Sequence, residues 1–263
     1  MHSKIGLNNR WIAGLIHVPP LPGTPFYKNN LDEIIISCVK SAKALQQGGA
    51  NGCLVQTVDK IYSVKDTTDP LRLIALNKIT QAIRNETDSS FEIGVQIMRN
   101  ANKAALATAL SCEGQFVRVE TFVGNSLSPQ GMVHSNPLSL LEYRAKIQAG
   151  EIKLVADIKT RHYEWYQGNK SVAEVANYAK NCGADAVAIE DKSEKKVISM
   201  INEIRERNEQ LPVILAGYTN FENAKELLSH ANGAYVGSCI EDKKTGLVSA
   251  ELVRRYMDIV NSI

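Results

Sequence analysis

The stretch from residue 153 to residue 190 decides how the chain folds, because it contains a complete strand–helix–strand unit. Lys153-Leu-Val-Ala-Asp-Ile-Lys159 and Ala186-Val-Ala-Ile-Glu190 are apolar on consecutive positions rather than on alternate ones. This pattern predicts parallel strands that are covered on both faces. Residues 172–181 between them have helical periodicity, begin at the capping-box pattern Ser171-x-x-Glu174 and are followed by Gly183.

The same unit recurs along the chain. Together with 153–157 and 186–190, strands are predicted at residues 12–17, 52–56, 91–98, 116–120, 212–216 and 233–236. Helices are predicted after them at residues 31–47, 71–84, 101–112, 138–148, 172–181, 195–207, 221–229 and 250–260. Eight strands, each followed by a helix, in about 250 residues are typical of a (β/α)8 TIM barrel. We expect one TIM-barrel domain over residues 1–263, with a doubly wound open sheet as the alternative.

Helix-start signals support these boundaries. Asn30-x-x-Glu33 and Thr219-x-x-Glu222 match the capping box, in which two side chains satisfy free backbone amides at the start of a helix. Asp69-Pro70 and Asn136-Pro137 place a capping residue before a proline at the first helical position. These signals predict four further helix starts.

Composition narrows the class of protein. The 263 residues are 44% hydrophobic and 22% charged with a net charge of +2, which gives no reason to expect nucleic acid or an anionic membrane as partner. No apolar run reaches the roughly 18 residues of a membrane helix, and the N-terminus lacks an apolar signal-peptide core. The five cysteines are scattered, as free thiols in a reducing compartment are. We expect a soluble, cytoplasmic protein, and the sequence leaves a homo-oligomer open.

Charged residues gather where the strands end. In a TIM barrel the chemistry lies at the mouth, the face formed by the carboxyl ends of the strands and the loops that follow. Four of these loops are long, at residues 18–30, 57–69, 121–136 and 158–170. Because side chains alternate along a strand, small residues are expected inward and Val and Ile outward. The residues then expected to converge on the mouth are Arg118, Glu120, Asp157, Lys159 and Glu190, with His17 ending the first strand and Gln96 and Arg99 ending the third.

These residue types suit proton transfer. Paired carboxylates separate their pKa values through repulsion and burial, so Asp157, Glu120 and Glu190 are candidate acids and bases. Lys159 is expected to act as an acid or an electrostatic clamp, because Asp157 favours its charged form; a Schiff-base role is the other reading. Structural ion pairs remain the alternative for each charged residue.

The last two strands carry glycine turns. Gly217 and the pair Gly237-Ser238 stand where many barrels bring backbone N–H groups to a phosphate, although such glycines also serve tight turns. His162 lies on a loop, where it either binds substrate or is merely solvated. We find no metal-ligand motif and expect no cofactor. A divalent ion is left open if certain side chains converge, namely His17, Glu120, Asp157, His162 and Glu190.

Residues 14–25, Gly-Leu-Ile-His-Val-Pro-Pro-Leu-Pro-Gly-Thr-Pro, closely resemble the N-terminal signature of the BtpA family. Other segments agree in order: Gln96-Ile-Met-Arg-Asn100, Phe116-Val-Arg-Val119, Tyr143-Arg144, Ala156-Asp-Ile-Lys-Thr-Arg-His162 and Ala231-Asn-Gly-Ala-Tyr-Val-Gly-Ser238. The resemblance implies a ribulose-phosphate-binding type of barrel. It implies less about activity, since the family is named for photosystem I biogenesis while other members accompany sugar-metabolism genes.

This chain departs from the family pattern at three places. Gln56-Thr57 replaces a Glu-Asn pair, residues 190–194 replace a Thr-Gly-rich stretch, and Ala216-Gly217-Tyr218 replaces a Gly-Ser-Gly turn. We expect an enzyme of the lyase or isomerase type that acts on a small phosphorylated, sugar-like metabolite. A non-catalytic ligand-binding or assembly factor and a nucleoside- or nucleotide-processing barrel are the alternatives.

The four prolines of residues 19–25 form a stiff loop that cannot rejoin a sheet or start a helix. This loop is expected to be a preorganised rim with His17 at its base, facing the mouth. Bracing of the top of the barrel is the other interpretation.

Overall fold

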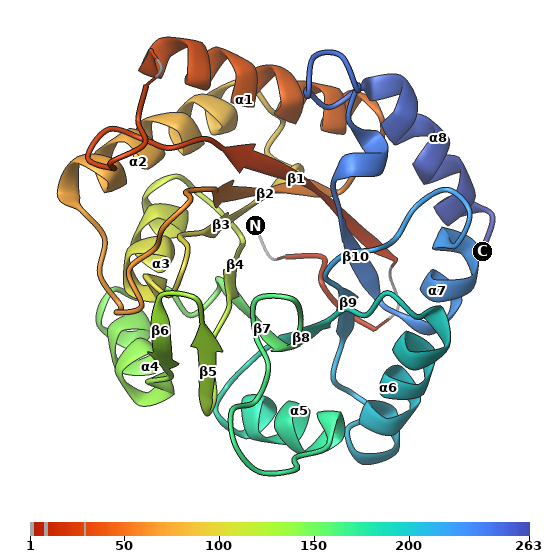
Figure 1. Ribbon diagram of the computed structural model, residues 1–263. Coiled ribbons are helices and arrows are strands. Elements are labelled where there is room, and N and C mark those ends of the chain that lie inside the picture. The colour runs from red at the N-terminus through yellow and green to blue at the C-terminus, as the bar shows by residue number, and fades with distance from the viewer. Residues whose placement is uncertain (1–2, 8–9, 29) are drawn as a thin grey trace.

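A computed structural model describes residues 3–7, 10–28 and 30–263, so parts of the N-terminal stretch considered above for a targeting signal lie outside it. Within these residues eight parallel strands close a barrel in the order β1-β10-β9-β8-β7-β4-β3-β2 (Figure 1). The strands are β1 (Trp11–Val18), β2 (Gly52–Thr57), β3 (Glu92–Gln96), β4 (Phe116–Val119), β7 (Lys153–Lys159), β8 (Ala186–Ile189), β9 (Val213–Leu215) and β10 (Gly233–Val236). The predicted TIM barrel is confirmed.

Helices surround the strands as an outer ring (Figure 1). In the described part of the chain they are α1 (Leu31–Gln47), α2 (Pro70–Asn85), α3 (Asn102–Ser111), α4 (Pro137–Lys146), α5 (Val172–Asn181), α6 (Glu194–Arg207), α7 (Ala224–His230) and α8 (Ala250–Asn261), with a short 3-10 turn η1 (Ser238–Ile240). The predicted helices match within one to three residues at each end. None of these helices is long and apolar enough to cross a membrane.

The alternation of side chains separates two cores. Ala186 and Ala188 of β8 lie in the interior of the barrel, whereas Val187 and Ile189 pack outward in the core beneath the helices. The interior is filled by large rings, with Trp11 meeting Phe116 edge to face at a centroid distance of 4.9 Å. The predicted inward placement of small residues therefore holds at β8.

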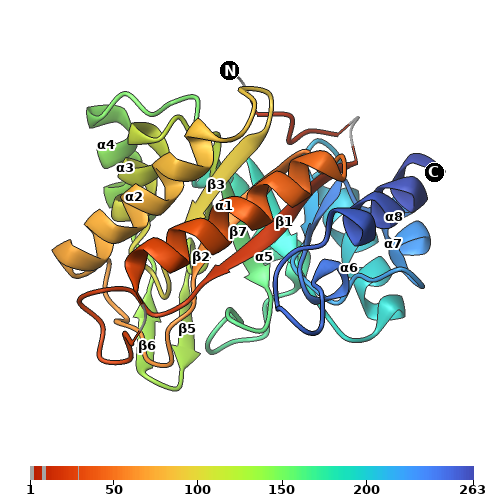
Figure 2. The ribbon, with the colours of Figure 1, turned by 90° about the horizontal axis from the view of Figure 1, so that it is seen from above.

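The N-terminal end of the barrel is closed by residues near the start of the chain. The buried carboxylate of Glu92 accepts hydrogen bonds from the hydroxyl of Ser3, the backbone N–H of Lys4 and the indole N–H of Trp11. Ile5 is buried in the interior core above this contact. Figure 2 shows the N-terminal segment at one end of the barrel and the loops of the mouth at the other.

One element was absent from the prediction. The loop of residues 121–136 contains an antiparallel hairpin of β5 (Asn125–Ser128) and β6 (Gly131–His134). Its strands have four residues each and little hydrophobic alternation, so the pattern gave no signal. The hairpin is joined to the β7–α5 loop, since Asn125 O accepts a hydrogen bond from Tyr166 N at 2.9 Å.

Most helix starts are as predicted. Asp69 accepts backbone N–H groups with its side chain, and Ser171 forms a complete capping box with Glu174. Asn30 caps α1, but through the N–H of Asp32 rather than in the predicted box with Glu33. The Thr219-x-x-Glu222 capping box is wrong, because α7 begins at Ala224 after the N-cap residue Asn223. The Thr219 hydroxyl instead bonds the Tyr256 hydroxyl at 2.6 Å, which holds the β9–α7 loop against α8.

Candidate active site

A cavity of about 690 Å³ opens at the mouth of the barrel. This is within the range of small-molecule sites. Most of its charged or strongly polar walls come from different strand ends and the loops after them, namely His17, Gln56, Arg118, Arg161, His162 and Glu190. Of the polar strand ends predicted to meet at this face, His17, Arg118 and Glu190 line the cavity, and His162 of the β7–α5 loop lines it with them. Gln96, Arg99, Glu120 and Asp157 are buried and are not among its lining residues.

Arg118 and Asp157 form the most buried ion pair of the site. Arg118 Nε and Nη2 donate to the two carboxylate oxygens of Asp157 at 2.8 and 2.9 Å, and Thr160 Oγ1 donates to Asp157 Oδ2 at 3.0 Å. Burial opposes the charge of the guanidinium, but Asp157 keeps the pKa of Arg118 above its usual value. Arg118 lines the cavity and its guanidinium stacks over the Tyr235 ring, whereas Asp157 lies beneath it. Asp157 is thus placed to position Arg118.

Glu190 directly follows β8, and its two carboxylate oxygens have different surroundings. Its Oε1 accepts hydrogen bonds from the backbone N–H of Arg161 at 2.5 Å and from Arg161 Nε at 3.0 Å. Its Oε2 faces the backbone of Gly217, where an added Cβ would lie only 2.5 Å away. The glycine therefore lets the β9–α7 loop approach the carboxylate. The buried Glu190 lines the cavity with Oε2 free of hydrogen bonds to other described residues.

Two histidines face the same cavity in neutral form. Burial, reinforced by the positive charges of Arg118, Arg99 and Arg161, lowers the pKa of His162 to about 3. Partial burial also lowers the pKa of His17, although Glu241, 3.6 Å from its Nδ1, raises it. Neutral imidazoles can both accept and donate a hydrogen bond, so they suit contacts to hydroxyl and carbonyl groups of a ligand.

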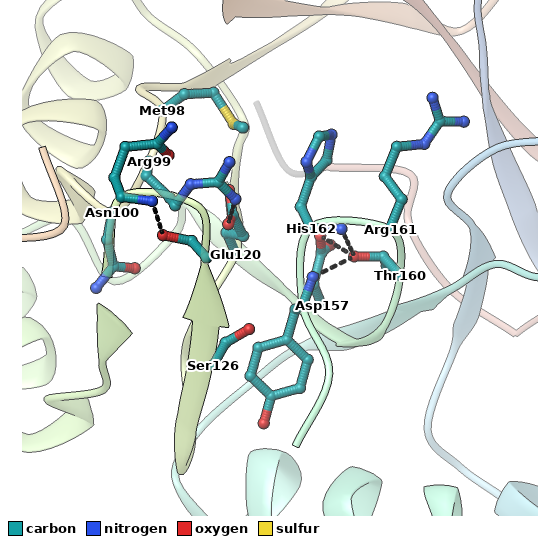
Figure 3. A network of polar contacts seen from close by, with 12 residues as sticks. Met98, Arg99, Asn100, Glu120, Ser126, Asp157, Thr160, Arg161 and His162 are labelled. Atoms are coloured by element: carbon teal, nitrogen blue, oxygen red, sulfur yellow. Dashed lines mark hydrogen bonds and ion pairs between the residues drawn. The ribbon is translucent and has the colours of Figure 1, made fainter. Parts of the chain in front are cut away.

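A second buried ion pair lies at the ends of β3 and β4. Arg99 Nη1 donates to Glu120 Oε1 at 2.6 Å, and Figure 3 shows this pair apart from Asp157, Thr160 and His162. Burial raises the pKa of Glu120 to about 8, although Arg99 lowers it. Glu120 is therefore a carboxyl group able to carry a proton near neutral pH. Gln96, the end of β3, is equally buried and pairs in register with the cavity-lining Gln56.

Lys159 does not reach the mouth, and the predicted convergence is wrong at this residue. The register of β7 with β8 shifts between Asp157 and Lys159, so Lys159 pairs with the outward-facing Ile189. This β-bulge turns the lysine to the outer surface, where it forms an ion pair with Glu164. Thr160 occupies the inward position instead, as its bond to Asp157 shows.

The glycine turns after β9 and β10 border the cavity as predicted. Gly217, Gly237 and Ser238 line it together with Lys243. Among the described residues no hydrogen bond uses the backbone N–H of Gly217, Gly237 or Ser238. Amides without protein partners beside cationic side chains can bind an anion.

The Pro-rich loop follows β1 and packs on the start of α2. Leu21 anchors it in the core, and Gly23 takes a φ of +87° where an added Cβ would lie 2.3 Å from Asp69 Oδ1. Pro19 lines a smaller cavity of about 200 Å³, which shares Leu15 and His17 with the mouth cavity. The loop therefore stands at the rim beside His17, packed on the N-cap of α2.

Sequence reasoning missed Arg161, the largest addition to the site. Arg161 holds Glu190 and stacks over the Tyr218 ring with its guanidinium 5.0 Å from the centroid. Its position beside His162 in the Lys159-Thr-Arg-His162 motif was the available signal, but side-chain direction in a loop follows no alternation. Within the described residues no three His, Cys, Asp or Glu side chains are grouped to hold a metal ion.

Comparisons with known proteins give the family and the fold. The model of the BtpA family matches residues 8–262. Relatives include an uncharacterized protein of Archaeoglobus fulgidus, 30% identical over 94% of this chain and 96% of its own length. The photosystem I biogenesis protein BtpA of Synechocystis is 24% identical over 88% of this chain and 80% of its own length.

Solved structures of similar fold are distant in sequence. Tryptophan synthase subunit alpha from Legionella pneumophila has a TM-score of 0.64 at 11% identity, covering 97% of this chain and 94% of that one. Phosphoribosyl anthranilate isomerase from Thermus thermophilus has a TM-score of 0.56 at 13% identity, covering 95% and 98%. At such identities the likeness establishes the fold.

Proposed function

This chain belongs to the BtpA family, and we propose that it is an enzyme that moves protons on a small phosphorylated, sugar-like metabolite, as lyases and isomerases do. The observation that carries the proposal is the cavity at the mouth, where Glu190 lies among Arg118, Arg161 and His162 and one of its carboxylate oxygens has no hydrogen-bond partner among the described residues. A carboxylate beside fixed cations and neutral imidazoles is suited to proton abstraction next to a carbonyl group.

The phosphate of the substrate would rest on the β9 and β10 turns. Within the described part of the chain the backbone N–H groups of Gly217, Gly237 and Ser238 have no hydrogen-bond partner, and Lys243 adds a positive charge at the same wall. The fold supports this placement, because barrels often bind phosphate at the loops after their last two strands. The phosphoribosyl group in the name of the isomerase of similar fold is consistent with it.

The end of the substrate that carries the reacting carbonyl group would lie over Arg118. Glu190 Oε2 would take the proton, and the guanidiniums of Arg118 and Arg161 would stabilise the negative charge that develops on the carbonyl oxygen. His17 and His162, both neutral, would hydrogen-bond the carbonyl and hydroxyl oxygens. Glu120 would return a proton, since its raised pKa keeps it protonated near neutral pH. Asp157 would act by positioning Arg118.

A Schiff base on Lys159 is not part of this proposal. Its ammonium pairs with Glu164 on the outer surface, away from the cavity. This leaves acid–base chemistry by carboxylates and imidazoles as the mechanism that the cavity supports best.

Two measurements test the proposal. Thermal-shift titrations with inorganic phosphate and a panel of tetrose, pentose and hexose phosphates should raise the melting temperature. Ligands that bind are then incubated with the protein in heavy water, where proton abstraction replaces a carbon-bound hydrogen with deuterium that is visible by NMR. Glu190→Gln should bind but not exchange, and Lys159→Met is the matched control at a strand end outside the cavity. Binding without exchange by the wild-type protein would contradict an enzymatic role.

One alternative has an observation of its own. The Synechocystis relative is named a photosystem I biogenesis protein, which favours a non-catalytic assembly factor with the same fold. Binding of phosphorylated ligands without any deuterium exchange is the result that this alternative predicts.

A further inference from the structure

Gln96, at the end of β3, has a buried side-chain amide whose donor and acceptor groups are unused. It is 1% exposed, yet neither its Oε1 nor its Nε2 has a hydrogen-bond partner among the described residues. A buried amide without partners costs roughly 1–3 kcal/mol. Other buried side-chain atoms of the described residues also lack a partner, but Gln96 is the one side chain with two such atoms. Buried polar groups that remain unpaired point to a missing partner.

Two side chains near Gln96 also have buried polar atoms without hydrogen-bond partners. Glu120 Oε2 and Arg99 Nε are also buried without partners in the described part of the chain, although the two side chains are joined through their other atoms. The ladder pairs Gln96 with Gln56, and Gln56 and Arg118 both line the mouth cavity. We call Gln96, Arg99 and Glu120 the β3–β4 subsite. None of its three residues is among those that line the cavity, so the subsite is buried next to the cavity, beside Gln56.

The barrel places this subsite opposite the proposed phosphate site. In the closed strand order, β3 and β4 are separated from β9 and β10 by two strands on either side, β2 with β1 and β7 with β8. A ligand with its phosphate on the β9 and β10 turns would therefore extend its other end across the mouth toward Gln96 and Glu120.

The unpaired atoms specify the chemistry of that end. Gln96 offers one acceptor oxygen and one donor amide, and Glu120 Oε2 offers an acceptor or, when protonated, a donor. A carboxylate or a second phosphate could satisfy only the donors and would leave the amide oxygen of Gln96 facing its negative charge. A pair of hydroxyl groups satisfies both kinds, because each hydroxyl donates once and accepts.

From this complementarity we infer that the β3–β4 subsite binds the hydroxyl-bearing end of the substrate, so that the enzyme takes a monophosphate with a neutral polyol end and discriminates against acids and bisphosphates. The inference rests on the proposed function, because the phosphate site sets the orientation of the ligand.

The test compares ligands that differ at one end. Calorimetric titrations of the full chain use inorganic phosphate, ribose 5-phosphate, glucose 6-phosphate and 6-phosphogluconate. At least one sugar phosphate should bind about tenfold or more tighter than inorganic phosphate, as expected from one or two added hydrogen bonds. The carboxylate of 6-phosphogluconate should weaken its binding at least about tenfold relative to glucose 6-phosphate.

The variants Gln96→Met and Gln96→Leu remove the amide but keep a similar volume. Each variant should bind the sugar phosphate only as tightly as inorganic phosphate. The affinity for inorganic phosphate should not change. Without ligand, at least one should melt at or above the wild-type temperature, because an unsatisfied buried amide has been removed. Gln115→Leu is the matched control: Gln115 is also buried, but its amide accepts from Ile93 N and donates to Glu113 O, so this variant should melt lower and bind normally.

Several outcomes would overturn the inference. Both Gln96 variants melting as low as Gln115→Leu would make Gln96 a structural residue. Sugar phosphates binding no tighter than inorganic phosphate, or 6-phosphogluconate binding as well as glucose 6-phosphate, would remove the hydroxyl specificity while the phosphate site stands. If inorganic phosphate and every sugar phosphate fail to bind, the proposed function fails and this inference falls with it.

Discussion

The two ends of the barrel hold buried carboxylates under opposite conditions. At the N-terminal end Glu92 accepts hydrogen bonds from a hydroxyl, a backbone amide and an indole. At the mouth Glu120 has one oxygen bound to Arg99 and the other without a partner among the described residues. The glutamines repeat the contrast, since both the oxygen and the nitrogen of the Gln115 amide are hydrogen-bonded, whereas neither atom of the Gln96 amide has a partner among the residues that the structure describes.

This difference separates residues that stabilise the fold from residues that await a ligand. A buried polar group with its partners in place contributes to folding, whereas one without them lowers stability until something binds. Substitutions at the N-terminal end should therefore affect stability without affecting binding. At the mouth, substitutions of residues with unpaired polar atoms should weaken ligand binding without lowering stability.

The largest effect is expected at Glu190. Glu190→Gln keeps the shape of the side chain but removes the base, so deuterium exchange into a bound sugar phosphate should fall by about 100-fold or more. Its melting temperature and ligand affinity should stay close to those of the wild-type protein. Exchange that survives in this variant would transfer the role of base to another residue, with the NMR exchange rate as the measurement.

Asp157 shows that the mouth also contains structural pairs. Asp157→Ala leaves the guanidinium of Arg118 buried without its partner, which should lower the free energy of unfolding by about 3–5 kcal/mol. Urea denaturation measures this change, and Lys159→Ala on the outer surface should stay within about 0.5 kcal/mol of the wild-type value. Equal effects of the two substitutions would contradict the assignment of Lys159 to the outer surface.

Glu92 tests the other end of the barrel. Glu92→Ala strips partners from Trp11 and Lys4 and should lower the free energy of unfolding by about 1–3 kcal/mol. Calorimetric affinity for phosphate and sugar phosphates should not change in the folded variant. A loss of affinity as large as that of Gln96→Met would break the distinction between the two ends.

The smallest effect concerns His162 and pH. Its pKa is about 3 in the folded protein and near the usual 6.5 when unfolded, so the unfolded chain binds more protons between these values. Stability therefore rises with pH across this window and is lost as pH falls below 6.5, by at most about 1.4 kcal/mol per pH unit from this group. His162→Asn should flatten the urea-derived stability profile between pH 6.5 and 5. An unchanged slope would show that the imidazole is not buried among cations.

The sequence predicted elements that follow from local chemistry. Parallel strands such as β8, and helix starts such as Asp69-Pro70, depend on nearby residues and were placed within a few positions. The hairpin of β5 and β6 was missed because its short strands show little hydrophobic alternation, and its hydrogen bond from Tyr166 N to Asn125 O joins it to a loop distant in sequence. Thr219 looked like a capping residue but bonds Tyr256, a tertiary contact that no local pattern encodes.

The candidate site was predictable where strand alternation holds. Arg118 and Glu190 reached the cavity as their positions implied. Lys159 did not, because a β-bulge shifts the register after Asp157, and Arg161 could not be aimed because it lies in a loop. Which charged groups pair with one another and which stay unsatisfied depends on three-dimensional neighbours, so the contrast between Gln96 and Gln115 was beyond the reach of the sequence.

The bulge in β7 also redistributes mutational tolerance along the strand. Because it turns residue 159 outward and residue 160 inward, the hydroxyl that supports Asp157 comes from Thr160 and the contacts to Glu190 come from Arg161. In a library randomised across this segment, position 159 would accept many amino acids while positions 157, 160 and 161 would accept few. Evolution could thus redesign the outer surface at Lys159 without disturbing the chemistry one residue away.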